Sequence, residues 1–90
     1  MTAEEKLHSV LDSMCTTGQA MYAARGTSEY ELYEREMDDL RIEFEVALYR
    51  LPTKMARRVF LVNTYNTNLG RFKKGLLVIK AILLDEISKN

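Results

Sequence analysis

Apolar residues recur at intervals of three and four through most of the chain, the spacing that places them on one face of an α-helix. The first run begins after Thr2 and Glu5, which form the pattern of a capping box. It ends before Gly26, since glycine readily adopts the left-handed turn that stops a helix. The pattern predicts a helix over residues 3–25. Its apolar positions are Leu7, Val10, Leu11, Met14, Gly18, Met21 and Tyr22.

A second run has the strict seven-residue period of a coiled coil. Ser28 and Glu31 form another capping box before it, and Pro52, which cannot continue a helix, follows it. We expect a helix over residues 28–51 whose apolar face packs against another helix. The apolar positions are Tyr30, Tyr33, Met37, Leu40, Phe44, Ala47 and Leu51.

Thr53 is a suitable cap for a third helix over residues 53–88. Residues 63–70 are rich in asparagine and threonine and end on a glycine, and each such residue costs about 0.5 to 1 kcal/mol relative to alanine inside a helix. A kink or a break at 63–70 is therefore the alternative to one continuous helix. The positions in helical phase are Met55, Val59, Val62, Tyr65 or Asn66, Leu69, Phe72, Leu76, Ile79, Leu83 and Ile87.

These runs predict an all-α fold in which one domain spans residues 1–90. The 90 residues include four glycines and one proline, which is few for a turn-rich β-protein. We expect a three-helix arrangement whose second and third helices form a long antiparallel hairpin about Pro52.

Several features favour the cytoplasm. Cys15 is the single cysteine, so a disulfide within the chain is excluded and a reducing compartment is favoured. The first residues lack the basic and apolar segments of a secretory signal. The most apolar window, residues 76–84, has about half the length of a membrane span and contains Lys80. We expect no membrane contact.

The formal net charge of zero conceals an acidic first half and a basic second half. Eleven of the 13 acidic residues lie within 4–45, and residues 46–84 contain none. In a hairpin about Pro52 the two halves neutralise each other. The expected pairs are Glu31 with Lys73, Glu34 with Arg71, and Glu45 with Arg57 and Arg58.

The basic residues could alternatively bind nucleic acid, as Arg57, Arg58, Arg71, Lys73 and Lys74. We favour neutralisation, because these bases are scattered around the helix axis, whereas a DNA-binding helix concentrates positive charge on one face.

Three groups have the composition of a catalytic or metal site but lack parts that such a site needs. Glu5 and His8 match one Glu-x-x-His pair of a di-iron bundle, which requires a second pair and two further carboxylates. Cys15 lies two helical turns from His8, too far for a thiolate–imidazole pair. The acidic residues of 31–39 have the spacing of Mg²⁺ ligands but alternate with an arginine that can pair with them. We expect neither an enzyme nor a bound metal or cofactor.

A small-ligand site is a further alternative. Tyr30 and Tyr33 belong to the coiled-coil face, and the hydroxyl of a buried tyrosine needs a polar partner. Tyr65 and Asn66 lie in the polar part of the third helix, where a polar residue usually fixes register or oligomeric state. These four residues could line a pocket at an oligomer interface.

One segment resembles a tetratricopeptide-type helical hairpin. Its residues follow the order of leucine, tyrosine, glycine, aromatic and small residues in that repeat, as Leu61, Tyr65, Gly70, Phe72, Gly75 and Ile79. Residues 44–52 are similar to the end of a preceding repeat. One extra residue precedes Gly70, Ile82 replaces a small residue, and no proline closes the repeat. The resemblance covers about a third of the chain and implies a groove for a peptide or a helix.

Apolar residues off the predicted helix faces carry the strongest indication of function. Residues 76–84 are apolar on every side of the helix except at Lys80, and the end of the second helix is similar. Because each helix of a three-helix monomer buries one face, the remaining apolar side chains should form an interface. They include Val46, Tyr49, Leu76, Leu77, Val78 and Leu84.

We therefore expect a non-enzymatic protein of the adaptor, chaperone or inhibitor type, which acts through contact with other proteins. We also expect it to associate with itself, as a homodimer or a higher oligomer.

Overall fold

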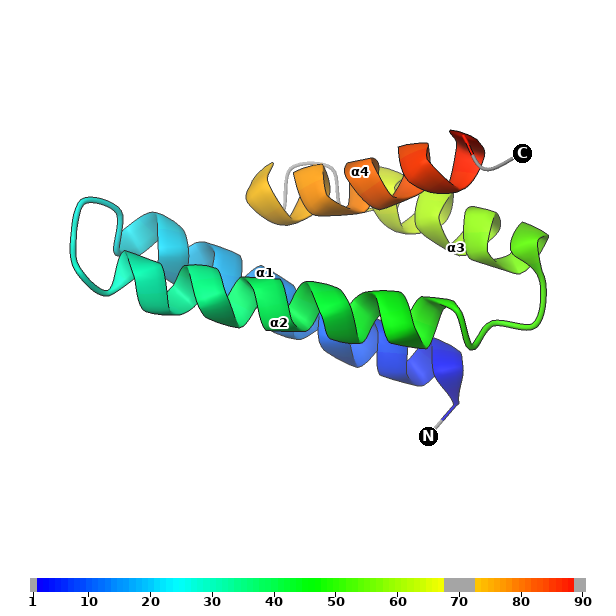
Figure 1. The fold of residues 1–90 in the computed structure, drawn as a ribbon, viewed down its shortest axis with the longest axis horizontal. Helices are drawn as coiled ribbons and strands as arrows, with labels where there is room; N and C mark the ends of the chain where they lie inside the picture. The colour runs from blue at the N-terminus through cyan, green and yellow to red at the C-terminus, as the bar shows by residue number, and fades with distance from the viewer. Residues whose placement is uncertain (1, 68–72, 89–90) are drawn as a thin grey trace.

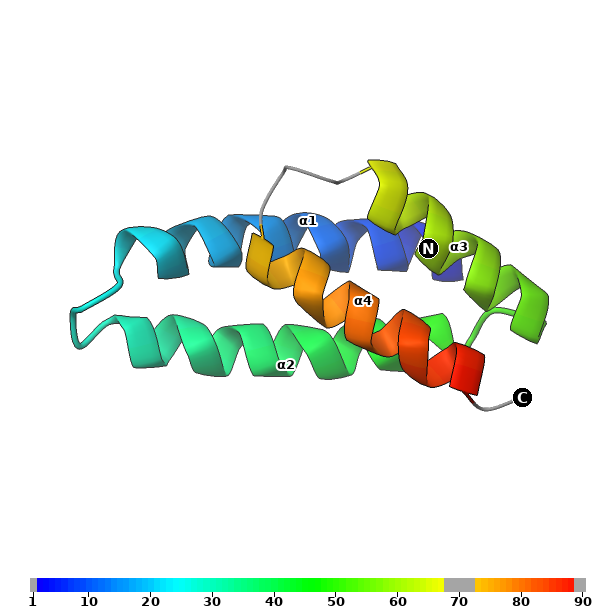
Figure 2. The same ribbon diagram turned by 90° about the horizontal axis from the view of Figure 1, so that it is seen from above.

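The computed structural model describes residues 2–67 and 73–88, with side chains for 2–66 and 80–88. Every secondary-structure element among them is an α-helix, so the predicted all-α class is confirmed. The helices are α1 (Ala3–Ala23), α2 (Tyr30–Leu48), α3 (Lys54–Thr67) and α4 (Lys73–Ser88). They form two layers, with α3 and α4 lying across the pair of α1 and α2 (Figures 1 and 2).

The antiparallel hairpin of the lower layer consists of α1 and α2 (Figure 2). Gly26 permits the turn between them, because it adopts a positive φ of 80° that costs other residues free energy. Thr27 Oγ1 donates a hydrogen bond of 2.6 Å to the carbonyl of Ala24, at the end of α1. The expected hairpin of the second and third helices about Pro52 is wrong. A heptad period predicts that a helix has a partner but does not identify which one.

The prediction of three helices is also wrong, because α3 ends at Thr67 and α4 begins at Lys73. The break was the alternative left open for residues 63–70. After it the chain reverses, so α4 runs antiparallel to α3 (Figure 1). Folding back allows α4 to bury Ile82 and Glu86, which are 6% and 1% exposed. This burial adds to the poor helix propensity of the asparagine-rich segment in favouring the break.

The first two apolar faces were predicted well. The seven positions of the coiled-coil face in α2 and the segment after it are buried or partly buried in the core. In α1 the exception is Tyr22, which is 68% exposed and lies under the guanidinium of Arg25. The core comprises Leu7, Val10, Leu11, Met14, Cys15, Met21, Met37, Phe44, Ala47, Leu48, Leu51, Phe60, Leu61 and Ile82.

The predicted face of α3 points the wrong way. Met55, Val59 and Val62 are 67%, 49% and 41% exposed, whereas Phe60 and Leu61 are buried. This helix is apolar on two opposite sides, and only one of them can face the core. Phe60 and Leu61 lie on the side that faces the core. We call the exposed row of Met55, Val59 and Val62 the outer stripe of α3.

Two of the three predicted helix caps are confirmed. Thr2 and Glu5 form the reciprocal capping box of α1, with bonds of 3.2 and 3.1 Å. Thr53 Oγ1 accepts the N–H of Ala56 at 3.0 Å in the first turn of α3. The capping box of Ser28 and Glu31 is wrong, because α2 begins at Tyr30 after Glu29, whose side chain makes no cap bond.

The capping box predicts an acid-sensitive first turn of α1. Hydrogen bonds from the backbone and then from the side chain of Thr2 lower the pKa of the Glu5 carboxyl below its ordinary value. The stabilisation is therefore complete above the unfolded pKa of about 4.3 and is lost as the pH falls through the lower folded pKa. An NMR titration of Glu5 should show the lowered pKa, and Thr2→Ala should raise it. Thr16→Ala, the same change elsewhere on α1, should leave it unaltered; an equal response would contradict this assignment.

Candidate functional site

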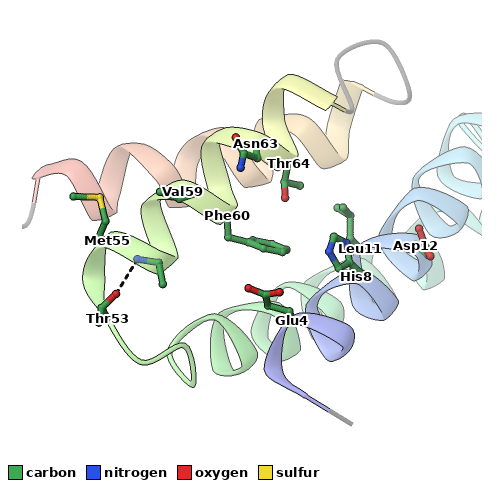
Figure 3. Close-up of a pocket in the computed structure, with 11 residues that line it drawn as sticks. Glu4, His8, Leu11, Asp12, Thr53, Met55, Val59, Phe60, Asn63 and Thr64 are labelled. Atoms are coloured by element: carbon green, nitrogen blue, oxygen red, sulfur yellow. Dashed lines mark hydrogen bonds between the residues drawn. The ribbon is translucent and has the colours of Figure 1, made fainter.

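A groove of about 730 Å³ lies between α1 and α3 (Figure 3). The two helices meet at its base through His8 and Phe60, whose ring centroids are 5.3 Å apart in an edge-on contact. The residues that line the groove are Glu4, His8, Leu11, Asp12, Thr53, Met55, Ala56, Val59, Phe60, Asn63 and Thr64.

The wall that α1 contributes is polar and acidic. Glu4, His8 and Asp12 are four residues apart, so they occupy one side of the helix on successive turns. All three are exposed, while Leu11 beside them is buried. The capping box at Thr2 fixes the first turn of this helix and with it the position of Glu4.

The wall that α3 contributes is apolar at its rim and base. Met55 and Val59 of the outer stripe line the rim, and Phe60 projects toward α1 (Figure 3). Phe60 is 9% exposed because its other side lies against Phe44 of α2, at a centroid distance of 6.3 Å. Phe60 therefore closes the base of the groove and anchors α3 on the lower layer.

The chemistry of the groove suits binding. Among the described residues of the lining none is Lys or Arg, and the carboxylates of Glu4 and Asp12 place negative charge beside its apolar surface. Within 2–66 and 80–88, no three side chains of His, Cys, Asp or Glu gather in a way that could hold a metal ion. A ligand that combines apolar groups with positive charge matches this lining.

A second apolar surface lies on α2, where the sequence predicted an interface. Val46 and Tyr49 are 51% and 48% exposed, and Ile42, one turn earlier, is 61% exposed. Leu84 on α4 is also more than half exposed. The boundary between these two helices is a depression that includes Arg41, Glu45 and Asp85. We call Ile42, Val46 and Tyr49 the α2 stripe. The other predicted interface residues, Leu76, Leu77 and Val78, have side chains outside the described part.

Two of the predicted nucleic-acid contacts are directed into the protein. Arg57 Nε donates to Glu86 Oε2 at 3.4 Å, and Arg58 Nη2 donates to the backbone carbonyl of Glu86 at 3.3 Å. The hydroxyl of Tyr49 donates to Glu86 Oε1, and the guanidinium of Arg57 lies 4.9 Å from the centre of its ring. We call this group the Glu86 cluster. Nothing is described for the side chains of Arg71, Lys73 and Lys74.

The charge pairing therefore differs from the expectation. Glu45 accepts from Arg41 on its own helix at 3.3 Å, and Glu43 pairs with Lys6 of α1 at 2.9 Å. Arg57 pairs with Glu86, one of the two acids that lie beyond residue 84. The predicted pairing of Glu45 with Arg57 and Arg58 is wrong, because it rested on the hairpin about Pro52. The pairs with Lys73 and Arg71 lie outside the described side chains.

The four residues proposed for a small-ligand pocket do not line one common depression among the described residues. Tyr33 lines a shallow depression at the turn between α1 and α2, which includes neither Tyr65 nor Asn66. Tyr30, Tyr33 and Tyr65 are partly buried against the core, whereas Asn66 is exposed. These three tyrosines thus contribute to packing.

The groove was not predicted from the sequence, because the outer stripe of α3 was expected to lie in the core. Two signals could have revealed it. Phe60 and Leu61 are apolar but lie off the predicted face, which shows that this helix has two apolar sides. His8 lies one turn from both Glu4 and Asp12, so the three side chains share a surface.

Comparison with models of known protein families, with curated proteins and with solved structures found no match for this chain. The tetratricopeptide resemblance of residues 61–79 therefore stays a prediction, and neither Leu61 nor Tyr65 lines the groove. None of the helices within the described ranges has the length and apolar character that crossing a membrane requires.

The Glu86 cluster predicts a large loss of stability when one partner is removed. Arg57→Leu leaves the carboxylate of Glu86 buried without its guanidinium partner, and we expect unfolding in urea to require about 3 kcal/mol less free energy. The double variant Arg57→Leu, Glu86→Leu removes both charges and should recover most of this loss.

The matched control is Lys6→Ala, which removes the exposed ion pair with Glu43. Its cost should be about 1 kcal/mol or less, since both side chains are more than two-fifths exposed. A cost for Arg57→Leu no larger than that of the control would show that the Glu86 cluster does not hold the upper layer.

Proposed function

We propose that this protein is a non-enzymatic helical protein that acts by binding other proteins and by associating with itself. The observation that supports the proposal best is the presence of apolar side chains at one-turn spacing on solvent-facing sides of α2 and α3. Contiguous exposed apolar surface is typical of an interface. An adaptor, a chaperone or an inhibitor acts through such surfaces without chemical conversion.

Self-association is assigned to the α2 stripe together with Leu84 of α4. Ile42, Val46 and Tyr49 follow the i, i+4, i+7 spacing of a helix that packs against another helix. A second copy related by a two-fold axis would present the same stripe, so the contact is self-complementary. Leu76, Leu77 and Val78 were expected to extend this surface and remain part of the proposal.

The two alternative functions have less support. The nucleic-acid alternative requires five basic residues, and two of them, Arg57 and Arg58, donate hydrogen bonds to Glu86 instead of facing outward. The small-ligand alternative requires Tyr30, Tyr33, Tyr65 and Asn66 to act together, and no described depression includes all four. We therefore place both behind protein binding.

The proposal predicts that a charge in the α2 stripe weakens self-association. We expect light scattering coupled to size exclusion to report a dimer or a larger species for the native protein. The double variant Ile42→Lys, Val46→Lys should associate at least about tenfold more weakly, because it buries two charges in an apolar contact. Leu32→Lys is the control, since Leu32 is 61% exposed on the same helix about 15 Å before Ile42.

The same light-scattering experiment at several salt concentrations provides a second test of self-association. Helix α2 contains seven acidic and two basic residues, so two copies of it repel each other and added salt should strengthen their association. A native protein that stays monomeric at high micromolar concentration would refute self-association. So would an equal effect of Leu32→Lys.

A further inference from the structure

We propose that the groove between α1 and α3 binds an amphipathic helix of a different protein, with one apolar face and a row of Lys or Arg beside it. This inference rests on the protein-binding part of the proposed function and names the partner of a second surface. It does not depend on self-association through the α2 stripe.

The dimensions of the groove fit about two to three turns of a helix. On α1 the lining residues extend from Glu4 to Asp12, and on α3 with its preceding cap from Thr53 to Thr64. At a rise of 1.5 Å per residue, these lengths are about 12 and 16 Å. Both walls repeat once per turn, because Glu4, His8 and Asp12 on one side and Met55 and Val59 on the other are spaced by four residues. A helix has the same repeat, so its side chains can match both walls at once.

The two walls require different faces of the partner helix. Met55, Val59 and Phe60 offer apolar contacts to residues at i, i+4 and i+7 of the partner. Glu4 and Asp12 lie on the opposite wall and attract basic side chains that flank this apolar row. Acidic flanks would be repelled by the same two carboxylates. Charge complementarity thus selects a basic amphipathic helix among the possible occupants.

The α2 stripe and the outer stripe of α3 in a second copy do not have these properties. The α2 stripe is flanked by Glu43 and Glu45, which would approach Glu4 and Asp12 with like charge. The outer stripe of α3 is near Arg57 and Arg58, but both guanidinium groups are directed to Glu86. A basic helix of another protein therefore matches the groove better than either of these two stripes.

The test uses the full chain and two synthetic helix-forming peptides of about 16 residues. Both carry leucine at i, i+4, i+7 and i+11 on alanine, and they differ only in having Lys or Glu along one flank. Affinity is measured by fluorescence anisotropy. His8 is the only histidine of the chain, so its imidazole NMR signals report occupation of the groove directly.

We expect the Lys peptide to bind at least about tenfold more tightly than the Glu peptide and to shift the His8 signals. The double variant Glu4→Gln, Asp12→Asn should weaken its binding about fivefold to tenfold. Glu34→Gln, Asp38→Asn is the matched control, because it removes the same charge from exposed positions of α2 and should leave the affinity unchanged. If circular dichroism shows that the double variant is unfolded, Glu4→Gln alone replaces it. This single variant should lose less affinity for the Lys peptide.

Three results would overturn the assignment. The His8 signals could stay unmoved at saturating Lys peptide, or the α2 control could lose as much affinity as the groove variant. A shift of His8 with protein concentration alone would identify a second copy as the occupant. If light scattering shows that the native protein is a monomer while it still binds the Lys peptide, the proposed dimer is refuted. The groove assignment is then unaffected.

Discussion

The buried carboxylate of Glu86 is the constraint that orients the upper layer. Glu86 is 1% exposed, and burial of a carboxylate is costly unless it is paired and hydrogen-bonded. Tyr49 from the end of α2 and Arg57 from α3 supply the two partners of its oxygens. Arg58 binds the backbone carbonyl of the same residue, near the end of α4, where helix carbonyls lack internal partners. One side chain thus joins three helices.

The rotation of α3 about its axis follows from this constraint. Arg57 reaches Glu86 only when its own side of α3 faces α4 and the core. Phe60, Leu61 and Thr64 lie on that same side and are buried with it. Met55, Val59 and Val62 lie opposite and must face solvent. The same rotation sets Phe60 against His8, so the cluster also determines the base of the groove between α1 and α3.

Periodicity and capping patterns predicted what depends on local interactions. They identified α1 and α2 with their apolar faces, the turn at Gly26 and the caps at Thr2 and Thr53. They failed where distant residues decide between local options of similar free energy. Both sides of α3 are apolar in helical phase, and the choice between them depends on Glu86, some thirty residues away. The groove lies beyond such reasoning for the same reason, since its walls come from helices that local patterns do not place side by side.

The distribution of charge makes the two proposed surfaces compatible. Helices α1 and α2 contain ten acidic and three basic residues, so their own side chains carry a net negative charge. That charge opposes the approach of a second acidic helix and attracts a basic one. The proposed self-association at the α2 stripe would therefore derive its free energy from apolar burial. In the proposed complex the groove would add electrostatic attraction to its apolar contacts, and this difference would allow each surface to select its own partner.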